Sequence, residues 1–369
     1  MSDGGNFGTI FRSGGSTVAE AFAGQVAYCE ANDAPVTARV VAAIGACAAE
    51  PGSNPFFERI RDWSGPPIAD ALPLRAAGGY HALHLAGLEP DLKPIYRGDA
   101  ANDALIVRRI GDHRLAELMP WLDSPPQTNE AGRSASYVAA LLWLASIGLP
   151  ARFDCYEIGS SAGINLMLDR YHYDLGGVPV GPPFARMRIH PEWRGAPPPA
   201  GPIAFARLAG CDVAPIDLAD PAQALRLKAF VWPEARPRFE RIAAAIEEAE
   251  RQPPELVALD AATFVDRALA EPHEPGTTRV LMHSIVWQYV APDQRARILA
   301  AMDAAGAAAT PDKPLAWIAL EANRTTHQHE LAVRWWPRGH ACHVRLAHAQ
   351  AHGAWVEWLG TPQETSWPD

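Results

Sequence analysis

The sequence predicts an α/β protein in which a mostly parallel β-sheet follows an all-α N-terminal domain. From residue 151 onward, apolar segments of strand length alternate with amphipathic helical segments, which is typical of a parallel sheet covered by helices on both faces. The first third of the chain carries apolar residues at three- and four-residue spacing, the helical period. Residues 329–359 show period-two segments without an intervening helix, which predicts an antiparallel hairpin on the sheet's edge.

The N-terminal domain is expected to span residues 1–123 and to contain only helices. Its end is marked by residues 123–129, where consecutive prolines forbid a helix. Ser16 is the expected N-cap of the first helix. The expected helices cover residues 16–31, 35–49, 54–63, 72–87 and 102–122.

The second domain is expected to span residues 124–369. It opens with a helix over 129–146, with Thr128 as N-cap, and residues 174–202 read as a proline-rich insertion without regular structure. The expected strands cover residues 151–158, 203–213, 254–261, 278–286 and 315–322, and the expected helices between them cover 163–171, 234–251, 263–271 and 292–306.

Composition limits the classes of partner. A formal charge of -10 and a pI near 5.7 give no general attraction to nucleic acids or to anionic membranes. The five cysteines are far apart, so no disulfide framework is expected, and no apolar helical stretch is long enough to cross a bilayer. We therefore expect a soluble cytoplasmic protein. The clustered histidines lack helical metal-ligand spacing, and no metal site is expected at His327, His329, His340, His343, His348 or His352.

The stretch "YEIGSSAGINL", residues 156–166, permits two interpretations. It contains G-x-S-x-G, the elbow that presents a hydrolase serine, here Ser161. That elbow normally follows several strands and an oxyanion loop, whereas about 150 mostly helical residues precede this one. Ser161, Asp260 and either His283 or His352 supply the order of a catalytic triad, so the hydrolase stays an alternative.

The same stretch resembles motif I of class I S-adenosylmethionine-dependent methyltransferases, E/D-x-G-x-G-x-G. Glu157, Gly159 and Gly163 are in register, and Ser161 replaces the middle glycine. The resemblance implies a methyltransferase-like Rossmann sheet whose glycine loop, including Ser160 and Ser161, faces the amino-acid part of the cofactor. It further implies a ribose-binding acid at Asp212, or less favourably Asp217, and an adenine contact at Asp260. The N-P-P-Y signature of enzymes that methylate bases is replaced by "HSIVWQY", residues 283–289.

Several phrases in order also resemble an uncharacterised bacterial family, domain of unknown function 2332, over nearly the whole chain. This likeness implies a fold and no established reaction. The phrases are "QTNEAGRSA", "YEIGSSAGINL", "GCDVAPID", "FVWPE", "HSIVWQY" and "HGAWVEW".

Further candidate residues stand near the expected crevice. The start of the 129–146 helix should return to the ligand side, which brings Asn129 and Arg133 to the charged end of a cofactor; Gln127, Thr128 and Glu130 are neighbours there. The alternative is a capping box at Thr128 with a surface salt bridge.

His283, at the end of its strand, is the candidate proton acceptor, and the alternative is a histidine bonded to nearby backbone. Ser284 lies beside it at the same strand end. Glu321, Asn323 and Arg324 either line an acceptor pocket or form a solvated turn.

The sequence thus predicts a methyltransferase that uses S-adenosylmethionine and acts on a small molecule. A non-catalytic nucleoside-binding protein of the same fold is the first alternative, and a hydrolase using Ser161 is the second.

Overall fold

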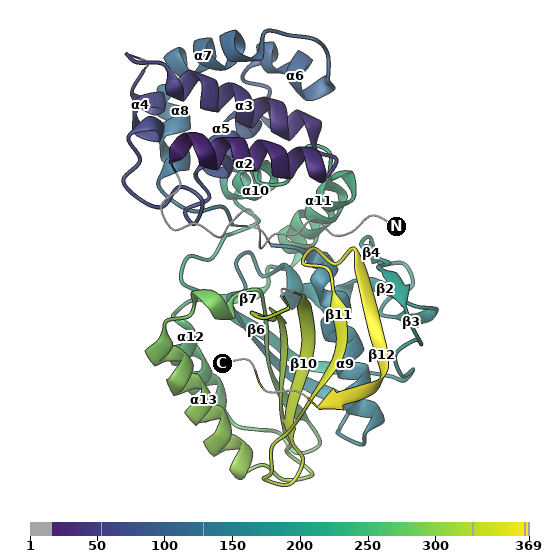
Figure 1. Cartoon of the computed structure of the whole chain (residues 1–369). Helices are drawn as coiled ribbons and strands as arrows, with labels where there is room; N and C mark the ends of the chain where they lie inside the picture. Colours follow the sequence, from purple (N-terminus) through teal and green to yellow (C-terminus); the bar gives the residue numbers. More distant parts are fainter. Residues whose placement is uncertain (1–16, 53, 128, 327, 365–366, 368–369) are drawn as a thin grey trace. The chain divides into compact units, whose positions relative to one another are not determined.

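The computed structural model describes residues 17–52, 54–127, 129–326, 328–364 and 367. The chain divides into two compact units, and Figure 1 labels many of their helices and strands. Unit 1 comprises Met1–Thr128 and Asp220–Glu240, and unit 2 comprises Asn129–Ala219 and Arg241–Asp369. Ser16, Thr128 and His327, for which a cap or a metal role was considered, lie outside the described residues.

The regular structure of unit 1, over its described residues, is helical. The first helix begins where Thr17 and Glu20 form a capping box: the Glu20 amide donates to Thr17 Oγ1 at 3.2 Å, and the Thr17 amide donates to Glu20 Oε2 at 2.7 Å. The helices are α2 (Val18–Ala31), α3 (Pro35–Ala49), α4 (Pro55–Arg61), α5 (Leu72–Leu85), η1 (Pro90–Leu92), α6 (Lys93–Arg97), α7 (Asp103–His113), α8 (Leu115–Leu118), η2 (Met119–Leu122), α10 (Pro221–Ala229) and the first turn of α11 (Arg236–Arg251).

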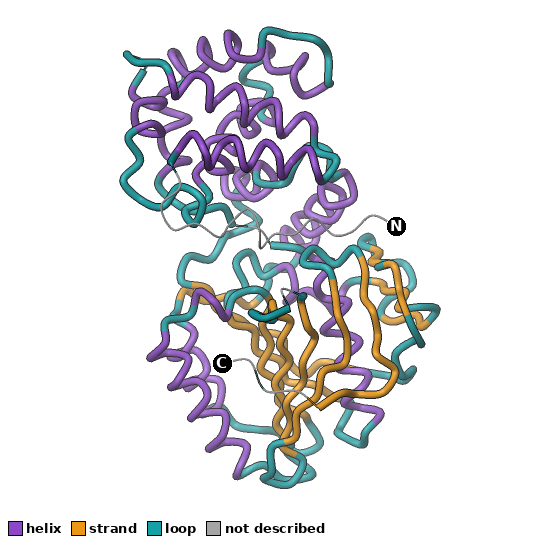
Figure 2. Tube along the Cα trace, viewed as in Figure 1, coloured by secondary structure: helices purple, strands orange, loops and turns teal. Residues whose placement is uncertain are grey.

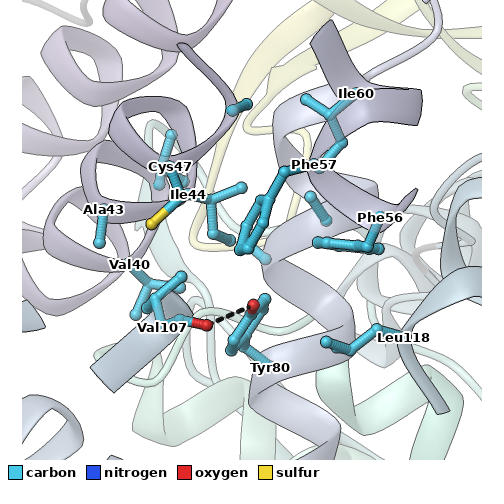
Figure 3. Packing of buried hydrophobic residues seen from close by; sticks show 14 of the residues in the cluster. Val40, Ala43, Ile44, Cys47, Phe56, Phe57, Ile60, Tyr80, Val107 and Leu118 are labelled. Atoms are coloured by element: carbon cyan, nitrogen blue, oxygen red, sulfur yellow. Dashed lines mark hydrogen bonds between the residues drawn. The ribbon is translucent and has the colours of Figure 1, made fainter. Parts of the chain in front are cut away.

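The core of unit 1 is built from the apolar faces of these helices. Figure 3 shows Ile44 of α3, Phe57 of α4 and Tyr80 of α5 packed together. The Tyr80 hydroxyl satisfies its polar end by donating to the Val107 carbonyl at 2.8 Å. Burying these side chains is the main favourable contribution to the folding of the unit.

Unit 2 is organised around a nine-stranded sheet with the order β5-β12-β11-β10-β9-β8-β1-β6-β7. Figure 2 distinguishes its strands from the surrounding helices. Strands β7, β6, β1, β8 and β9 are parallel, β10 to β12 continue as an antiparallel meander, and β5 is parallel to β12. The strands are β1 (Arg152–Ile158), β5 (Glu192–Arg194), β6 (Ala204–Asp212), β7 (Glu255–Ala258), β8 (Thr278–Ser284), β9 (Leu315–Ala322), β10 (His329–Trp336), β11 (Cys342–Ala349) and β12 (Trp355–Glu364).

Within the described residues of unit 2, the remaining elements are a small sheet and several helical segments. The small sheet has the order β3-β2-β4. Its strands are β2 (His172–Leu175), β3 (Val178–Val180) and β4 (Arg188–Ile189). The helical segments are η3 (Ala131–Arg133), α9 (Ser134–Ser146), η4 (Ile164–Arg170), the rest of α11, α12 (Ala261–Ala270), η5 (Trp287–Tyr289) and α13 (Pro292–Ala307).

The mixed α/β class with a large, mostly parallel sheet is confirmed, while several local expectations are wrong. The proline-rich insertion is not structureless, because β2 to β4 pair with one another and β5 joins the main sheet. The closing hairpin is a three-stranded meander. The helix expected from residue 129 begins as α9 at Ser134, after one 3₁₀ turn, and the helix expected over 163–171 is the 3₁₀ segment η4, interrupted by non-helical Met167.

No helix within the described ranges of the chain is both long enough and apolar enough to cross a membrane.

Candidate functional site

The strand order of the parallel part reverses between β1 and β8. From β1 the chain passes to β6 and β7 on one side, and then to β8 and β9 on the other. The carboxyl ends of these strands lie at one edge of the sheet, and in open doubly wound sheets ligands bind outside that edge, at the reversal. The candidate site is therefore built on the residues that follow β1, β6, β7, β8 and β9.

Side-chain alternation divides these residues between two faces of the sheet. Tyr156 of β1, Leu281 of β8 and Trp317 of β9 pack in one cluster with buried residues of α12 and α13. Successive strand residues point to opposite faces, so His283 lies on this α13 face and Glu157 lies on the other. The second face is the α9 face, because the hydroxyl of Tyr137 in α9 reaches Glu157. The structure therefore does not place His283 directly beside Glu157.

Glu157 is a buried acid with one unsatisfied oxygen. Its residue is 2% exposed, and its Oε1 accepts from the Tyr137 hydroxyl at 3.2 Å and from Asn165 Nδ2 at 3.3 Å. Its Oε2 is buried and has no hydrogen-bond partner among the described residues, and the same holds for Asn165 Oδ1. Burial raises the pKa of Glu157 to about 7, although hydrogen bonds and the charge of Arg133 pull it partly back. Two neighbouring acceptor atoms are thus left for a donor.

Backbone amides of the glycine loop after β1 are hydrogen-bonded within the protein. Four of its amides donate to acceptors of the protein itself: Ser160 N to Cys211 O at 2.9 Å, Ser161 N to Asp212 Oδ2 at 2.9 Å, Gly163 N to Ser160 O at 2.8 Å and Ile164 N to Asn129 Oδ1 at 3.0 Å. The side chains of Asp212, at the end of β6, and Asn129, before α9, accept the amides of Ser161 and Ile164, in the loop where the sequence predicts a bound cofactor. The loop is consequently rigid and offers few donors to an anion.

The two glycines of the motif are required for conformation and close packing. Gly159 and Gly163 have φ values of +67° and +68°, in the left-handed region that favours glycine. A Cβ on Gly159 would lie 2.2 Å from Val286 Cγ2, and one on Gly163 would lie 2.8 Å from Pro254 Cγ. The space next to these glycines is filled by protein, so neither glycine directly exposes its backbone to a ligand in this conformation.

Asp212 and Asp260 both lie at the edge that carries the loop. Asp212 ends β6, where its Oδ2 binds the Ser161 amide and its Oδ1 accepts from Ala214 N at 2.9 Å. Asp260 follows β7 and is the N-cap of α12; a hydrogen bond from the Thr263 backbone lowers its pKa. Leu259 N donates to the Asp212 carbonyl at 3.1 Å, which joins the two strand ends. Asp217 lies farther along the chain and accepts from Ala219 N.

Asn129 and Arg133 are buried beside the loop. Asn129 holds the Ile164 amide, and Arg133 Nε donates to the Ala351 carbonyl at 2.8 Å. The positive charge of Arg133 lowers the pKa of Glu157, so the guanidinium lies within electrostatic reach of the acid. Both side chains are less than a tenth exposed, which rules out the surface salt bridge considered for Arg133. Gln127 belongs to unit 1.

Glu130, next to Asn129, serves as a local cap. It is buried, accepts from the Gly132 amide at 2.9 Å and pairs with Arg241 Nε at 2.7 Å. This buried carboxylate therefore fixes the turn that leads into α9.

His283 on the α13 face is bonded to a carboxylate and not to backbone. Its Nδ1 lies 2.7 Å from Glu321 Oε1, and the same oxygen accepts from Val286 N at 3.0 Å and Trp287 N at 3.2 Å. Both side chains are buried. The sequence placed both residues at the ends of neighbouring strands, and that shared position was the only sign that they would meet.

Asn323 and Arg324 form a turn after β9. Asn323 Oδ1 accepts from the amides of Thr325 and Thr326 at 2.8 and 3.0 Å, and Arg324 is exposed. This arrangement corresponds to the solvated turn and not to a pocket wall.

The triad of Ser161, Asp260 and His283 is not assembled among the described residues. Ser161 Oγ is buried and makes no hydrogen bond, His283 is held by Glu321, and Asp260 caps α12. Within the part of the chain that the structure describes, no group of three or more histidine, cysteine or acidic side chains is arranged to hold a metal ion.

Two distant sequence phrases meet at this site. Gly132 lies against the β11–β12 connection, where a Cβ on Gly353 would approach the Gly132 carbonyl carbon to 2.3 Å. The Arg133–Ala351 hydrogen bond lies at the same contact.

Comparisons with curated proteins and with solved structures gave no match. Residues 19–358 match the family described as "Uncharacterized protein conserved in bacteria (DUF2332)", and the chain therefore belongs to that family.

Proposed function

We propose that unit 2 binds S-adenosylmethionine at the carboxyl ends of β1, β6 and β7 and catalyses methyl transfer to a small-molecule acceptor. The observation that carries the proposal is the pair of buried, unpartnered acceptors Glu157 Oε2 and Asn165 Oδ1 where the strand order reverses. An unsatisfied buried polar atom is costly and calls for an explanation, such as a bound water, ion or ligand. Acids with a perturbed pKa, such as Glu157, cluster at functional sites.

The polarity of the site favours a cation over a phosphate. Phosphate-binding loops present bare amides, whereas four amides of this loop are bonded within the protein. The groups left without a partner among the described residues near the end of β1 are oxygens, and two further acids, Asp212 and Asp260, stand at the ends of β6 and β7. S-adenosylmethionine, whose sulfonium and ammonium groups are positive, suits this environment; when bound, it supplies a methyl group on positively charged sulfur.

Different residues of the site would bind the ribose, the base, the ammonium group and the carboxylate of the cofactor. Asp212 uses one acceptor position on each of its oxygens, so each keeps a second one for a ribose hydroxyl. We assign Asp260, which follows the next strand and caps α12, to the base. Glu157 and Asn165 would hold the ammonium group, and Arg133 is the cation nearest to receive the carboxylate.

A non-catalytic nucleoside-binding protein remains a second candidate because of one observation. Val286 fills the space next to Gly159, and this close packing suits a static scaffold as well as an enzyme in a closed form. Methyl transfer depends mainly on the alignment of acceptor and methyl group, so the small number of titratable groups does not separate the two.

Calorimetric titration with S-adenosylmethionine tests the binding step. We expect the full chain to bind it and Glu157→Gln to bind at least about tenfold more weakly, a loss of about 1.4 kcal/mol. The control is Glu255→Gln, which removes an exposed acid at the start of β7, away from the strand ends of the site. The proposal fails if the full chain shows no binding, or if Glu157→Gln binds like the unmodified protein.

Catalysis is tested separately by incubating the protein with methyl-labelled cofactor and a metabolite extract. Mass spectrometry that detects labelled small molecules supports the methyltransferase. Binding without any labelled product favours the scaffold.

A further inference from the structure

One oxygen of Glu321 collects three hydrogen bonds on the α13 face. Oε1 lies 2.7 Å from His283 Nδ1, and it accepts hydrogen bonds from Val286 N at 3.0 Å and from Trp287 N at 3.2 Å. Because an ionised carboxylate only accepts, the hydrogen of this shortest contact belongs to Nδ1. A neutral His283 then carries its lone pair on Nε2.

The ring of His283 is fixed from a second direction by Trp287. The two rings are stacked with centroids 5.2 Å apart and an interplanar angle of 21°. Nε2 is buried and has no hydrogen-bond partner among the described residues. The only hydrogen-bonding capacity left on this imidazole is therefore a lone pair on a single, well-oriented atom.

We propose that Glu321 is a positioning residue that holds His283 with its hydrogen on Nδ1, so that Nε2 accepts the proton of the methyl acceptor. This inference rests on the proposed methyl transfer. When the oxygen or nitrogen of the acceptor forms its bond to the methyl group, the bond from that carbon to the sulfonium would break with its electron pair left on sulfur. The demethylated cofactor would then leave as a neutral thioether, and the hydrogen of the acceptor would pass to Nε2 as a proton. The imidazolium that results is stabilised by the carboxylate at 2.7 Å.

The turn after β8 packs against both His283 and the glycine loop. Ile285 has a φ of +53°, a conformation that is an outlier for a β-branched residue. The next two residues, Val286 and Trp287, cover Gly159 and His283 respectively, and both donate their amides to Glu321. Glu321 thus anchors a turn that contains a strained residue and that packs against both the glycine loop and the ring of His283.

Nuclear magnetic resonance of ¹⁵N-labelled imidazoles tests the positioning without any ligand. The His283 signals are identified by their loss in His283→Gln. We expect a hydrogen on Nδ1 and a bare Nε2 in the full chain, and an upfield shift of that hydrogen in Glu321→Gln, which keeps an acceptor oxygen but removes the charge. Glu330→Gln is the matched control, since Glu330 pairs with Glu321 in the β9–β10 register. A hydrogen on Nε2, or an unchanged signal in Glu321→Gln, overturns the inference.

Kinetics test the catalytic consequence. In Glu321→Gln we expect kcat to fall about 100-fold, within the range for loss of general-base assistance, with KM for S-adenosylmethionine changed less than about twofold. An unchanged kcat contradicts the inference. If the unmodified protein binds no S-adenosylmethionine, the proposed function fails, and the resonance experiment alone decides the role of Glu321.

Discussion

Replacing Glu157 with glutamine should raise the free energy of unfolding of unit 2, relative to the unmodified protein, as the pH rises above neutrality. In the folded protein the pKa of this acid is raised from 4.5 to about 7, because burial penalises its charged form more than its hydrogen bonds favour it. A raised pKa means that the folded state binds the proton more tightly than the unfolded state does. The group's contribution to stability is therefore fully present below pH 4.5 and is lost as pH rises through about 7.

The size of the effect follows from the two pKa values. At about 1.4 kcal/mol per pH unit, the gap between them corresponds to about 3 kcal/mol. Glutamine at this position carries no charge at any pH, so the variant avoids the loss. The difference in unfolding free energy, variant minus unmodified protein, should grow by about 2–3 kcal/mol between about pH 5 and about pH 8.

Urea unfolding of both proteins across this pH range measures the difference directly. Asp154→Asn provides a contrast on the same strand, because Asp154 is buried but paired with Arg279 at 3.1 Å. Losing that charge should destabilise the protein, since Arg279 is left without its ionic partner. A Glu157→Gln difference that stays constant with pH would show that the buried acid is not protonated near neutrality and would refute the reasoning.

Three further outcomes are expected from the same geometry. Gly159→Ala should lower the free energy of unfolding in urea by about 3 kcal/mol or more, because the new Cβ would collide with Val286. Gly148 also has a positive φ but has open space around it, so Gly148→Ala should lower the same free energy by about 1 kcal/mol. Equal losses in the two variants would remove the packing explanation. Ser161→Ala should leave any ester hydrolysis unchanged, and abolished turnover of an ester panel would restore the hydrolase. Binding of S-adenosylmethionine near neutral pH should release protons from Glu157, so its apparent enthalpy should differ between phosphate and Tris buffers; identical enthalpies argue against an ammonium–carboxylate contact.

The sequence was most informative where the structure depends on local periodicity. The five parallel strands and the acids that follow them, among them Asp212 and Asp260, stand where alternating apolar segments put them. Strand β5 was missed because its pairing is long-range: Trp355 pairs with Glu192. The small sheet pairs locally, with Tyr173 opposite Val180, but its strands are short, lie among prolines and carry no periodic signal.

The sequence predicted that several of the candidate residues lie near one another, but it predicted few of their contacts. Glu157, Asn129 and Arg133 do lie together, yet the loop amides assigned to a ligand are bonded inside the protein. The hydrogen bond between Asn129 and Ile164 joins residues 35 positions apart, and the one between His283 and Glu321 joins residues 38 positions apart. Such pairings depend on how strands and helices pack, which a residue spacing does not encode.

The central claim, that the unpartnered oxygen of Glu157 receives a cationic group of S-adenosylmethionine, is tested most directly on the carboxyl carbon itself. Carbon-13 resonance of labelled glutamate should reveal a carboxyl group titrating near 7 that disappears in Glu157→Gln. Adding S-adenosylmethionine at about neutral pH should move this signal to its ionised position, because a nearby positive charge favours the carboxylate. A signal that does not move while the cofactor binds, or a cofactor that does not bind at all, would contradict the account.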